Sequence, residues 1–366
     1  PIDMIASASP AVYEQVIEAV GADEAVDAVV AIYVPPLVTR PEEVAAAIAR
    51  AAGSLSAEKP IASVYMSSRG TPAELSRGPR GPIPSYAFPE NAAMALAAAV
   101  RYGRWRARPV LPPAVLELEV EQKVRAIAAR LRGAMPEGGW VPPEDLAALL
   151  DVIGVPMAPF RRTGLDVEAA VAAGTELGYP VVLKAVAAEL LHKSDAGGVA
   201  LGLDSPPSLR RAADQMAARL HGAGVPIEGF LVQKQVSGGL EALVGVTTDP
   251  SLGPLLVAGL GGVHVELFRD VAFRLTPVTE LDAAEMLDEL RSRALLDGFR
   301  GSPRADRDAL IRVILRIGAL VEAMPEITEL DLNPVMVLGL GAGAIAVDGR
   351  MRLAARTIQV GGPQRS

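Results

Sequence analysis

The chain has 366 residues, 50% of them hydrophobic, a net charge of −8 and a pI near 5.2. This length and hydrophobic content predict two or three domains with sizeable cores. The negative charge argues against sequence-independent binding to nucleic acid, which needs a basic surface. Because the chain has no cysteine, disulfides, zinc thiolates and thiol nucleophiles are excluded.

The longest apolar runs, such as LGPLLVAGLGGV and VMVLGLGAGAIAV, are short and rich in glycine. We therefore expect buried strands and turns there, and no membrane insertion. The chain begins at Pro1, and no charged segment precedes an apolar one near its start. We expect a fragment, a processed chain or one half of a longer protein, and the lack of cysteine fits the reducing cytoplasm.

The first hundred residues alternate helical and strand patterns. Ser9 and Pro10 predict the start of a helix, AVYEQVIEAV. The apolar run AVDAVVAIYVPP predicts a strand buried on both faces, PEEVAAAIARAA a helix, KPIASVYM a strand and NAAMALAAAVRYGRW a closing helix. Strand, helix and strand in this order predict an open parallel sheet, so this part reads as an α/β domain.

A linker from Arg106 to Pro113 and a charged helix, LEVEQKVRAIAARLRG, lead to a second unit that starts near Trp140. Helices and strands are mixed in this unit, which predicts an α+β ligand-binding domain. Two long helices are expected over 281–298 and 307–324, before a closing strand segment over 327–353.

The closing segment offers oxygen ligands. Strand alternation puts Glu329, Asp331 and Asn333 on one face. The chain then turns at the glycines of GLGAG and returns to Asp348, so Asn333 and Asp348 should face each other in a hairpin. A carboxylate and an amide oxygen at that separation can share Mg²⁺. A solvated strand face is the alternative.

A second candidate stretch is LKAVAAELLHKSDAGGVALGL. Lys184 ends a strand, as a phosphate-binding lysine would, although many strand-end lysines only face solvent. His192 could be a base, a ligand or a phosphoryl acceptor, or it could be structural. Gly197 and Gly198 allow backbone amides to approach an anion, or simply form a hairpin turn.

A third stretch, FLVQKQVSGGLE, has the pattern of a hinge strand passing beneath a nucleobase. Glu241 could then reach a ribose or a metal. An ordinary edge strand would look the same. The segment GLGGV lacks the full spacing of a dinucleotide fingerprint and predicts a tight turn.

Five blocks together resemble a known family: LGYPVVLKAV, LLHKSDAGGVALGL, LVQKQVSGGLEALVGV, GLGGVHVELFRDVAFRLTP and ELDLNPVMV. They are similar to the ATP-grasp domain of the NDP-forming acyl-CoA synthetases, also called ADP-forming acetate-CoA ligases, which are relatives of succinyl-CoA synthetase. PIDMIASASPAVYEQ and VDAVVAIYVPPLVTRPEEVA resemble the flavodoxin-like CoA-ligase domain of fused members. The resemblance implies a ligase domain over 1–106, a linker and helix over 107–139, and an ATP-grasp domain over 140–366.

In that family, acyl-CoA, phosphate and ADP interconvert with an acid, CoA and ATP through an acyl phosphate and phosphohistidine. The resemblance implies that His192 takes the phosphoryl group, that Lys184 contacts nucleotide phosphates and that Gly197 with Gly198 forms a lid. It also implies that the strand around Gln233 and Lys234 holds adenine, that Glu241 lies by the nucleotide, and that Asn333 and Asp348 hold Mg²⁺. The implied cofactors are therefore Mg²⁺ and ATP or ADP.

The family's CoA-binding domain and the ligase domain with the first phosphohistidine have no counterpart in this sequence. We therefore expect a CoA-binding α-type subunit, or further N-terminal domains of the same polypeptide, as the partner in an oligomer. Two other functions stay open from the sequence. One is the catalytically silent, regulatory part of a Pat-type protein lysine acetyltransferase, and the other is an ATP-grasp carboxylate-amine ligase, which would not need His192.

Overall fold

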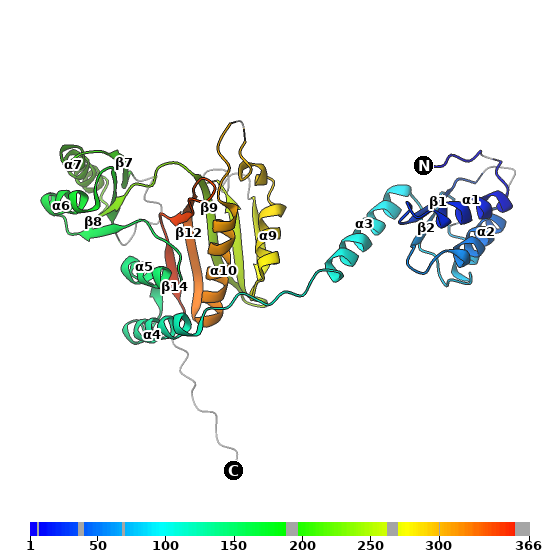
Figure 1. Cartoon of the computed structure of the whole chain (residues 1–366), viewed down its shortest axis with the longest axis horizontal. Coiled ribbons are helices and arrows are strands. Elements are labelled where there is room, and N and C mark those ends of the chain that lie inside the picture. Colours follow the sequence, from blue (N-terminus) through cyan, green and yellow to red (C-terminus); the bar gives the residue numbers. More distant parts are fainter. Residues whose placement is uncertain are drawn as a thin grey trace, which may run out of the picture. The chain divides into compact units, whose positions relative to one another are not determined.

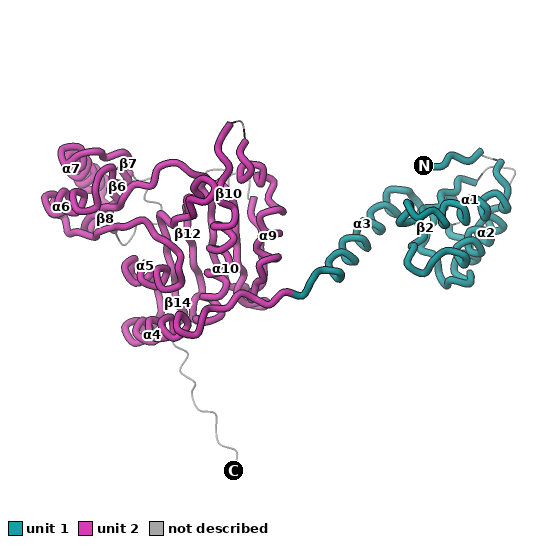
Figure 2. Tube along the Cα trace, in the orientation of Figure 1, with its two compact units in different colours: residues 1–110 teal, residues 111–366 magenta. Residues whose placement is uncertain are grey.

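The computed structural model describes residues 1–5, 7–35, 40–67, 70–187, 197–261, 270–299 and 301–355. The chain divides into two compact units, Pro1–Val110 and Leu111–Ser366 (Figure 2). Each unit has its own hydrophobic core. Within the described residues, no helix is both long and apolar enough to cross a membrane.

The first unit is a small parallel sheet with helices (Figure 1). Its strand order is β1-β2-β3, and both pairings are parallel. This confirms the parallel sheet predicted from the strand, helix, strand order. In chain order the elements are α1 (Pro10–Ala22), β1 (Val29–Tyr33), α2 (Pro41–Ser54), β2 (Ile61–Tyr65), the 3-10 helix η1 (Ala73–Ser76), β3 (Ser85–Tyr86) and α3 (Pro89–Arg106).

Strand β1 differs from the prediction that both of its faces are buried. Val29, Ala31 and Tyr33 are buried, but Val30 and Ile32 are 38% and 46% exposed. The reason is position, because β1 lies at the edge of the described sheet while β2 is buried along its whole length. Helix α3 packs against β2 and β3 and leaves the second face of β1 open. Composition alone could not reveal which strand lies at the edge.

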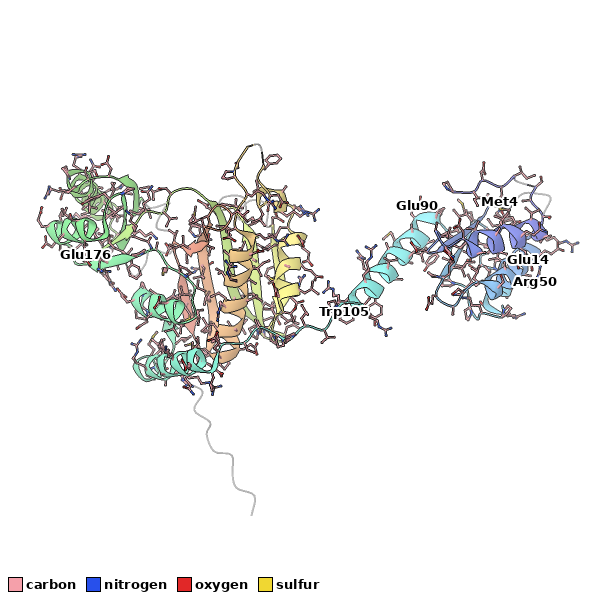
Figure 3. The ribbon with its side chains drawn as sticks, in the orientation of Figure 1. Met4, Glu14, Arg50, Glu90, Trp105 and Glu176 are labelled. Atoms are coloured by element: carbon pink, nitrogen blue, oxygen red, sulfur yellow. The ribbon has the colours of Figure 1, made fainter. Side chains whose placement is uncertain are left out.

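The buried face of this sheet holds a tyrosine cluster. The rings of Tyr13 and Tyr33 have centroids 5.9 Å apart, and those of Tyr33 and Tyr65 are 5.0 Å apart. Burial raises the pKa of the Tyr65 hydroxyl, which donates a 3.2 Å hydrogen bond to a backbone carbonyl oxygen. On the outside, Arg50 of α2 pairs with Glu14 of α1 at 2.8 Å (Figure 3).

The second unit contains two antiparallel sheets. The small sheet has the order β5-β8-β6-β7, and the large one has the order β11-β10-β9-β12-β14-β4, with β13 beside β12. The elements are α4 (Leu118–Ala134), β4 (Gly139–Trp140), α5 (Pro143–Val152), β5 (Phe160–Thr163), α6 (Val167–Leu177), β6 (Val181–Val186), β7 (Val199–Leu203), α7 (Pro206–Gly222), β8 (Gly229–Lys234), β9 (Leu240–Asp249), β10 (Gly253–Leu260), β11 (Val271–Leu275), α9 (Glu280–Glu289), the 3-10 helix η2 (Arg293–Leu295), α10 (Arg307–Ala323), β12 (Ile327–Val337), β13 (Ala344–Ala346) and β14 (Arg350–Leu353).

Each sheet buries one face under helices. Helices α6 and α7 cover the small sheet, where Leu183 of β6 and Val232 of β8 enter the core. Helices α9 and α10 cover the large sheet, where Leu330 and Leu332 of β12 are buried (Figure 1). Because side chains alternate along a strand, the residues between these apolar ones face away from the helices. Those opposite faces carry Lys184 and Gln233 in the small sheet and Asn333 in the large one.

The helix predicted over 281–298 is wrong in its second half, because α9 ends at Glu289. The carboxylate of Asp270 accepts hydrogen bonds from the backbone N–H groups of Arg291 and Ser292, at 2.9 and 2.8 Å. These N–H groups are therefore bound to a side chain from another part of the chain. Leu290 is buried in an extended conformation at the break. A tertiary contact thus overrides a helical pattern.

Helix α10 begins close to the predicted residue, with Asp306 as its buried N-cap. The carboxylate accepts hydrogen bonds from the N–H groups of Ala309 and Gly343, at 3.0 and 2.9 Å. Burial by itself would raise the pKa of Asp306, but these backbone donors hold it below its usual value. The same side chain thus caps α10 and fixes the segment before β13.

Candidate functional site

The β12–β13 hairpin brings Asn333 and Asp348 together as expected. Val335 pairs with Ala346, and the backbone N–H of Asn333 donates to the carbonyl oxygen of Asp348 at 3.2 Å. Asn333 is exposed, and the Asp348 side chain is 43% exposed. Both side chains can therefore offer oxygen atoms to a ligand.

Lys184 comes to the same place from the other sheet. Its neighbours Leu183 and Ala185 enter the core under α6 and α7, so the lysine points to the opposite face of β6. Its Nζ donates to Asp348 Oδ2 at 3.0 Å and to the carbonyl oxygen of Val347 at 3.2 Å. Only 8% of the lysine side chain is exposed. A buried ammonium group and a half-exposed carboxylate therefore join the two sheets.

Gln233 lies on the same face of the small sheet as Lys184 and is 1% exposed. Its Nε2 donates to the carbonyl oxygens of Ala158 and Val347, at 3.2 and 2.9 Å. Because both neighbours are acceptors, the amide nitrogen must face them. The buried Oε1 is left without a partner among the described residues. An unpaired buried acceptor is costly, so a donor from a ligand would be favoured there.

Lys234 does not join this group. It follows Gln233 in the strand and lies on the other face, where its Nζ donates to the carbonyl oxygens of Gly178 and Tyr179 at 2.8 and 3.1 Å. Glu241 of β9 is exposed and faces away from α10, opposite Met336 of β12. In the described residues, neither side chain forms a hydrogen bond or ion pair with Lys184 or Asp348.

Gly197 and Gly198 of the predicted glycine lid are among the described residues, but residues 188–196 before them are not. Gly198 accepts a 2.8 Å hydrogen bond from the N–H of Ala185, and Gly197 has a φ of +69°, which favours glycine. A Cβ at Gly197 would also lie 2.9 Å from the guanidinium of Arg219. His192 falls in residues 188–196, outside the described residues.

The sequence analysis missed Arg350 of β14. Its guanidinium reaches Glu329 at 3.2 Å and Asp331 at 3.4 Å, and it lies 5.3 Å from the ring centre of Trp140. Burial raises the pKa of Asp331, and Arg350 opposes this shift. Strand alternation could have placed Arg350 and Arg352 on one face, but the partner strand was unknown from sequence.

No group of three His, Cys, Asp or Glu side chains in the described ranges is arranged to hold a metal ion. Asn333 and Asp348 supply two oxygen-bearing side chains. This donor set fits Mg²⁺, which is usually bound by one or two carboxylates and completes its shell with phosphate oxygens and water.

Comparison with known proteins agrees with this two-sheet arrangement. Residues 133–353, more than half of the chain, match the ATP-grasp domain family. The chain belongs to the ATP-grasp family. Its ATP-grasp part includes both sheets of the second unit and all the candidate side chains described above.

Two curated relatives show how the ATP-grasp part occurs elsewhere. The β subunit of the ADP-forming acetate-CoA ligase II of Pyrococcus furiosus is 37% identical over 233 residues, which are 63% of this chain and 96% of that protein. The ADP-forming acetate-CoA ligase I of Archaeoglobus fulgidus is 37% identical over 274 residues, 74% of this chain but 39% of that protein. The chain therefore spans well under half of this longer relative.

Solved structures agree in fold. A dinucleotide-forming acetyl-coenzyme A synthetase 1 chain of Ca. Korarchaeum cryptofilum, in complex with coenzyme A and Ca-AMPCP, superposes with a TM-score of 0.57 and 35% identity. The match covers 63% of this chain and 99% of that chain. A second structure of that synthetase, with coenzyme A and Mg-AMPPCP, has a TM-score of 0.53 and 34% identity.

Proposed function

We propose that this chain is the nucleotide-binding half of an ADP-forming acyl-CoA synthetase. It transfers a phosphoryl group between ATP or ADP and a histidine, in the reaction that converts acyl-CoA, phosphate and ADP into acid, CoA and ATP. The observation that carries the proposal is the convergence of Lys184, Asp348 and Asn333 at the meeting point of two sheets. Membership of the ATP-grasp family and the likeness to ADP-forming ligase β subunits support it.

The nucleotide lies between the sheets in this proposal. Lys184 turns from Asp348 to the phosphate oxygens, because a phosphate carries more negative charge than one carboxylate. The Oε1 of Gln233 accepts a hydrogen bond from the amino group of adenine, which satisfies this buried oxygen. The strand at Lys234 contributes backbone groups, since its side chain is already bound to carbonyl oxygens. Glu241 lies by the ribose.

The same site holds Mg²⁺ through Asn333 and Asp348. When bound, the ion offsets negative charge on the transferring phosphoryl group. The loss of the Lys184–Asp348 contact on nucleotide binding frees the carboxylate oxygen for the metal. Gly197 and Gly198 close over the phosphates and exclude water.

His192 is the phosphoryl acceptor in this proposal. One imidazole nitrogen attacks the γ-phosphorus and forms an N–P bond while the P–O bond to the β-phosphate breaks, and ADP leaves with that bond's electron pair. In the reverse direction ADP takes the phosphoryl group back. Lys184 stabilises the oxygens of the group in transfer.

The remaining steps need partners. We propose residues 1–106 as a flavodoxin-like ligase domain, 107–139 as a linker and helix, and 140–366 as the ATP-grasp domain. A CoA-binding α-type part, either a separate subunit or another region of the same polypeptide, supplies the acyl-CoA or acid substrate and the first phosphohistidine. The assembly is an oligomer in the cytoplasm.

The test is phosphoryl transfer to the protein. The chain is incubated with Mg²⁺ and γ-labelled ATP, and acid-labile, base-stable label is expected on the wild type and absent from His192→Ala. His221→Ala is the matched control, because this exposed histidine lies in the last turn of α7 and its replacement should leave labelling unchanged. ATP binding without label, even with an α-type partner added, would contradict the proposal.

A further inference from the structure

One cavity of the second unit lies outside the proposed nucleotide site. It has a volume of about 290 Å³ and lies between residues 114–117 and the middle of α10. It is lined by Ala114, Val115, Glu117, Arg312, Leu315, Arg316 and Ala319. This lining contains two cationic side chains, four uncharged ones and a single carboxylate. The chain as a whole has a net charge of −8, whereas two arginines and one glutamate give this lining a net charge of +1.

The wall from α10 follows from helical spacing. Arg312, Leu315, Arg316 and Ala319 are separated by three, one and three positions, so they form one stripe along the helix. The opposite side of α10 is anchored in the core, where Ile314 and other residues are fully buried. Arg312 and Arg316 therefore lie one helical turn apart on a fixed support.

The second wall is also fixed. The N–H of Ala114 donates a 2.8 Å hydrogen bond to the carbonyl oxygen of Val278, and Leu116 is buried at 7% exposure. Glu117 is the N-cap residue of α4, but its side chain makes no capping hydrogen bond. The N-terminus of a 17-residue helix thus begins at the cavity and adds a partial positive charge.

The charges in the cavity are unbalanced. Within the described ranges, neither Arg312 nor Arg316 donates a hydrogen bond or forms a close ion pair, although the charge of Arg312 also acts on the buried carboxylate of Asp306. Elsewhere in this unit Arg274 and Arg307 both pair with carboxylates. Like charges four residues apart on a helix repel each other, and a bound anion would remove this repulsion. Glu117, in turn, limits how much negative charge the cavity accepts.

We propose that this cavity binds a small phosphate monoester. A phosphate group matches the planar fork of an arginine, and two arginines can hold one phosphate from two sides. Val115, Leu315 and Ala319 give the organic part of the monoester an apolar wall. The cavity is distinct from the proposed nucleotide site, because Lys184, Gln233 and Asp348 are not among the residues that line it.

The experiment measures binding of phenyl phosphate and of inorganic phosphate by isothermal titration calorimetry, without divalent ions and at constant ionic strength. The full chain carries Lys184→Met, which weakens anion binding at the nucleotide site. Phenyl phosphate should bind saturably and more tightly than inorganic phosphate. The double variant R312Q/R316Q should weaken it roughly a hundredfold, because two charge-assisted contacts are lost.

Two further variants test the sign of the effect. Glu117→Gln should tighten phenyl phosphate binding by roughly threefold, because it removes a nearby negative charge. The double variant R101Q/R104Q on α3 of the first unit makes the same charge change at residues that do not line the cavity, and it should leave binding unchanged. Unaltered binding in R312Q/R316Q, weakening in R101Q/R104Q of the same size, or inorganic phosphate binding as tightly as phenyl phosphate would overturn the proposal. If Lys184→Met binds phenyl phosphate as tightly as the parent chain does, the result supports a second phosphate site. That result says nothing against the phosphoryl-transfer proposal, which is tested separately by labelling of His192.

Discussion

The ion pair between Lys184 and Asp348 should respond very differently to removal of its two halves. Asp348→Asn leaves an ammonium group buried, since only 8% of the lysine side chain is exposed. Lys184→Met leaves a carboxylate that is 43% exposed and can return to water. We therefore expect Asp348→Asn to lower the free energy of unfolding clearly and Lys184→Met to change it little.

The distance between Lys184 and Asp348 determines how much stability Asp348→Asn should lose. Two unit charges 3.0 Å apart attract each other by about 5 kcal/mol at an effective dielectric constant near 20. Solvent around the exposed carboxylate screens part of this attraction, and the asparagine oxygen can still accept a hydrogen bond. We expect a loss of about 2 kcal/mol for Asp348→Asn. For Lys184→Met we expect a change within about 1 kcal/mol, because a buried charge is replaced by an apolar group of similar size.

Urea unfolding followed by tryptophan fluorescence tests this prediction. The chain has two tryptophans, and Trp105→Phe leaves Trp140 of β4 to report on the second unit. Trp105 is 58% exposed on α3, so its replacement should cost little. If Asp348→Asn is as stable as the parent, or if Lys184→Met loses as much stability as Asp348→Asn, the buried ion pair is not the link between the sheets.

Three other contacts are tested by single substitutions, one of them with a matched control. Asp306→Ala should lower the free energy of unfolding of the second unit by about 2 to 3 kcal/mol, because it removes a helix cap and leaves a second N–H unpaired. Since the folded pKa of Asp306 is lowered, its stabilisation is present above the unfolded pKa of about 4 and is lost as the pH falls. Urea titrations at several pH values should thus show a flatter acid profile for the variant, and an equally steep one would refute this. Gly229→Ala would put a Cβ 2.1 Å from the carbonyl oxygen of Thr163 and should lower the urea midpoint, whereas Gly222→Ala meets nothing within 4 Å and should leave it unchanged or raised. Tyr65→Phe loses one hydrogen bond and should cost the first unit about 1 kcal/mol, seen as a lower midpoint in a thermal melt followed by near-ultraviolet circular dichroism, and an unchanged midpoint would show that this bond adds nothing.

Local patterns predicted several elements well. The alternation in β12 and the glycine turn after it were enough to place Asn333 opposite Asp348, because a hairpin fixes its own register. The Ser9 and Pro10 signal predicted the start of α1, where Ser9 Oγ accepts a 3.4 Å hydrogen bond from the N–H of Val12. The start of α10 at Arg307 followed from its helical apolar pattern alone. In each case the determining residues are close together in sequence.

Predictions that depended on distant residues were weaker. The helix predicted over 281–298 ends early because the backbone N–H groups of Arg291 and Ser292 donate hydrogen bonds to Asp270, which precedes α9 in the sequence. Lys234 was grouped with Gln233, but strand alternation sends its side chain to the other face, toward Gly178. The different faces of these two side chains could have been predicted from sequence, because adjacent residues in one strand never share a face.

The sequence by itself determined the composition of the two units, most of the strands and helices, and the blocks that resemble the ATP-grasp domain. These features depend on hydrophobic periodicity and on short turns, and both are determined by residues close together in the sequence. Only the tertiary structure decided that Lys184 meets Asp348, 164 positions away, that Gln233 keeps an unpaired buried oxygen, and that β1 exposes one face. Such contacts arise when separate sheets pack together, and packing depends on the shape of the whole unit.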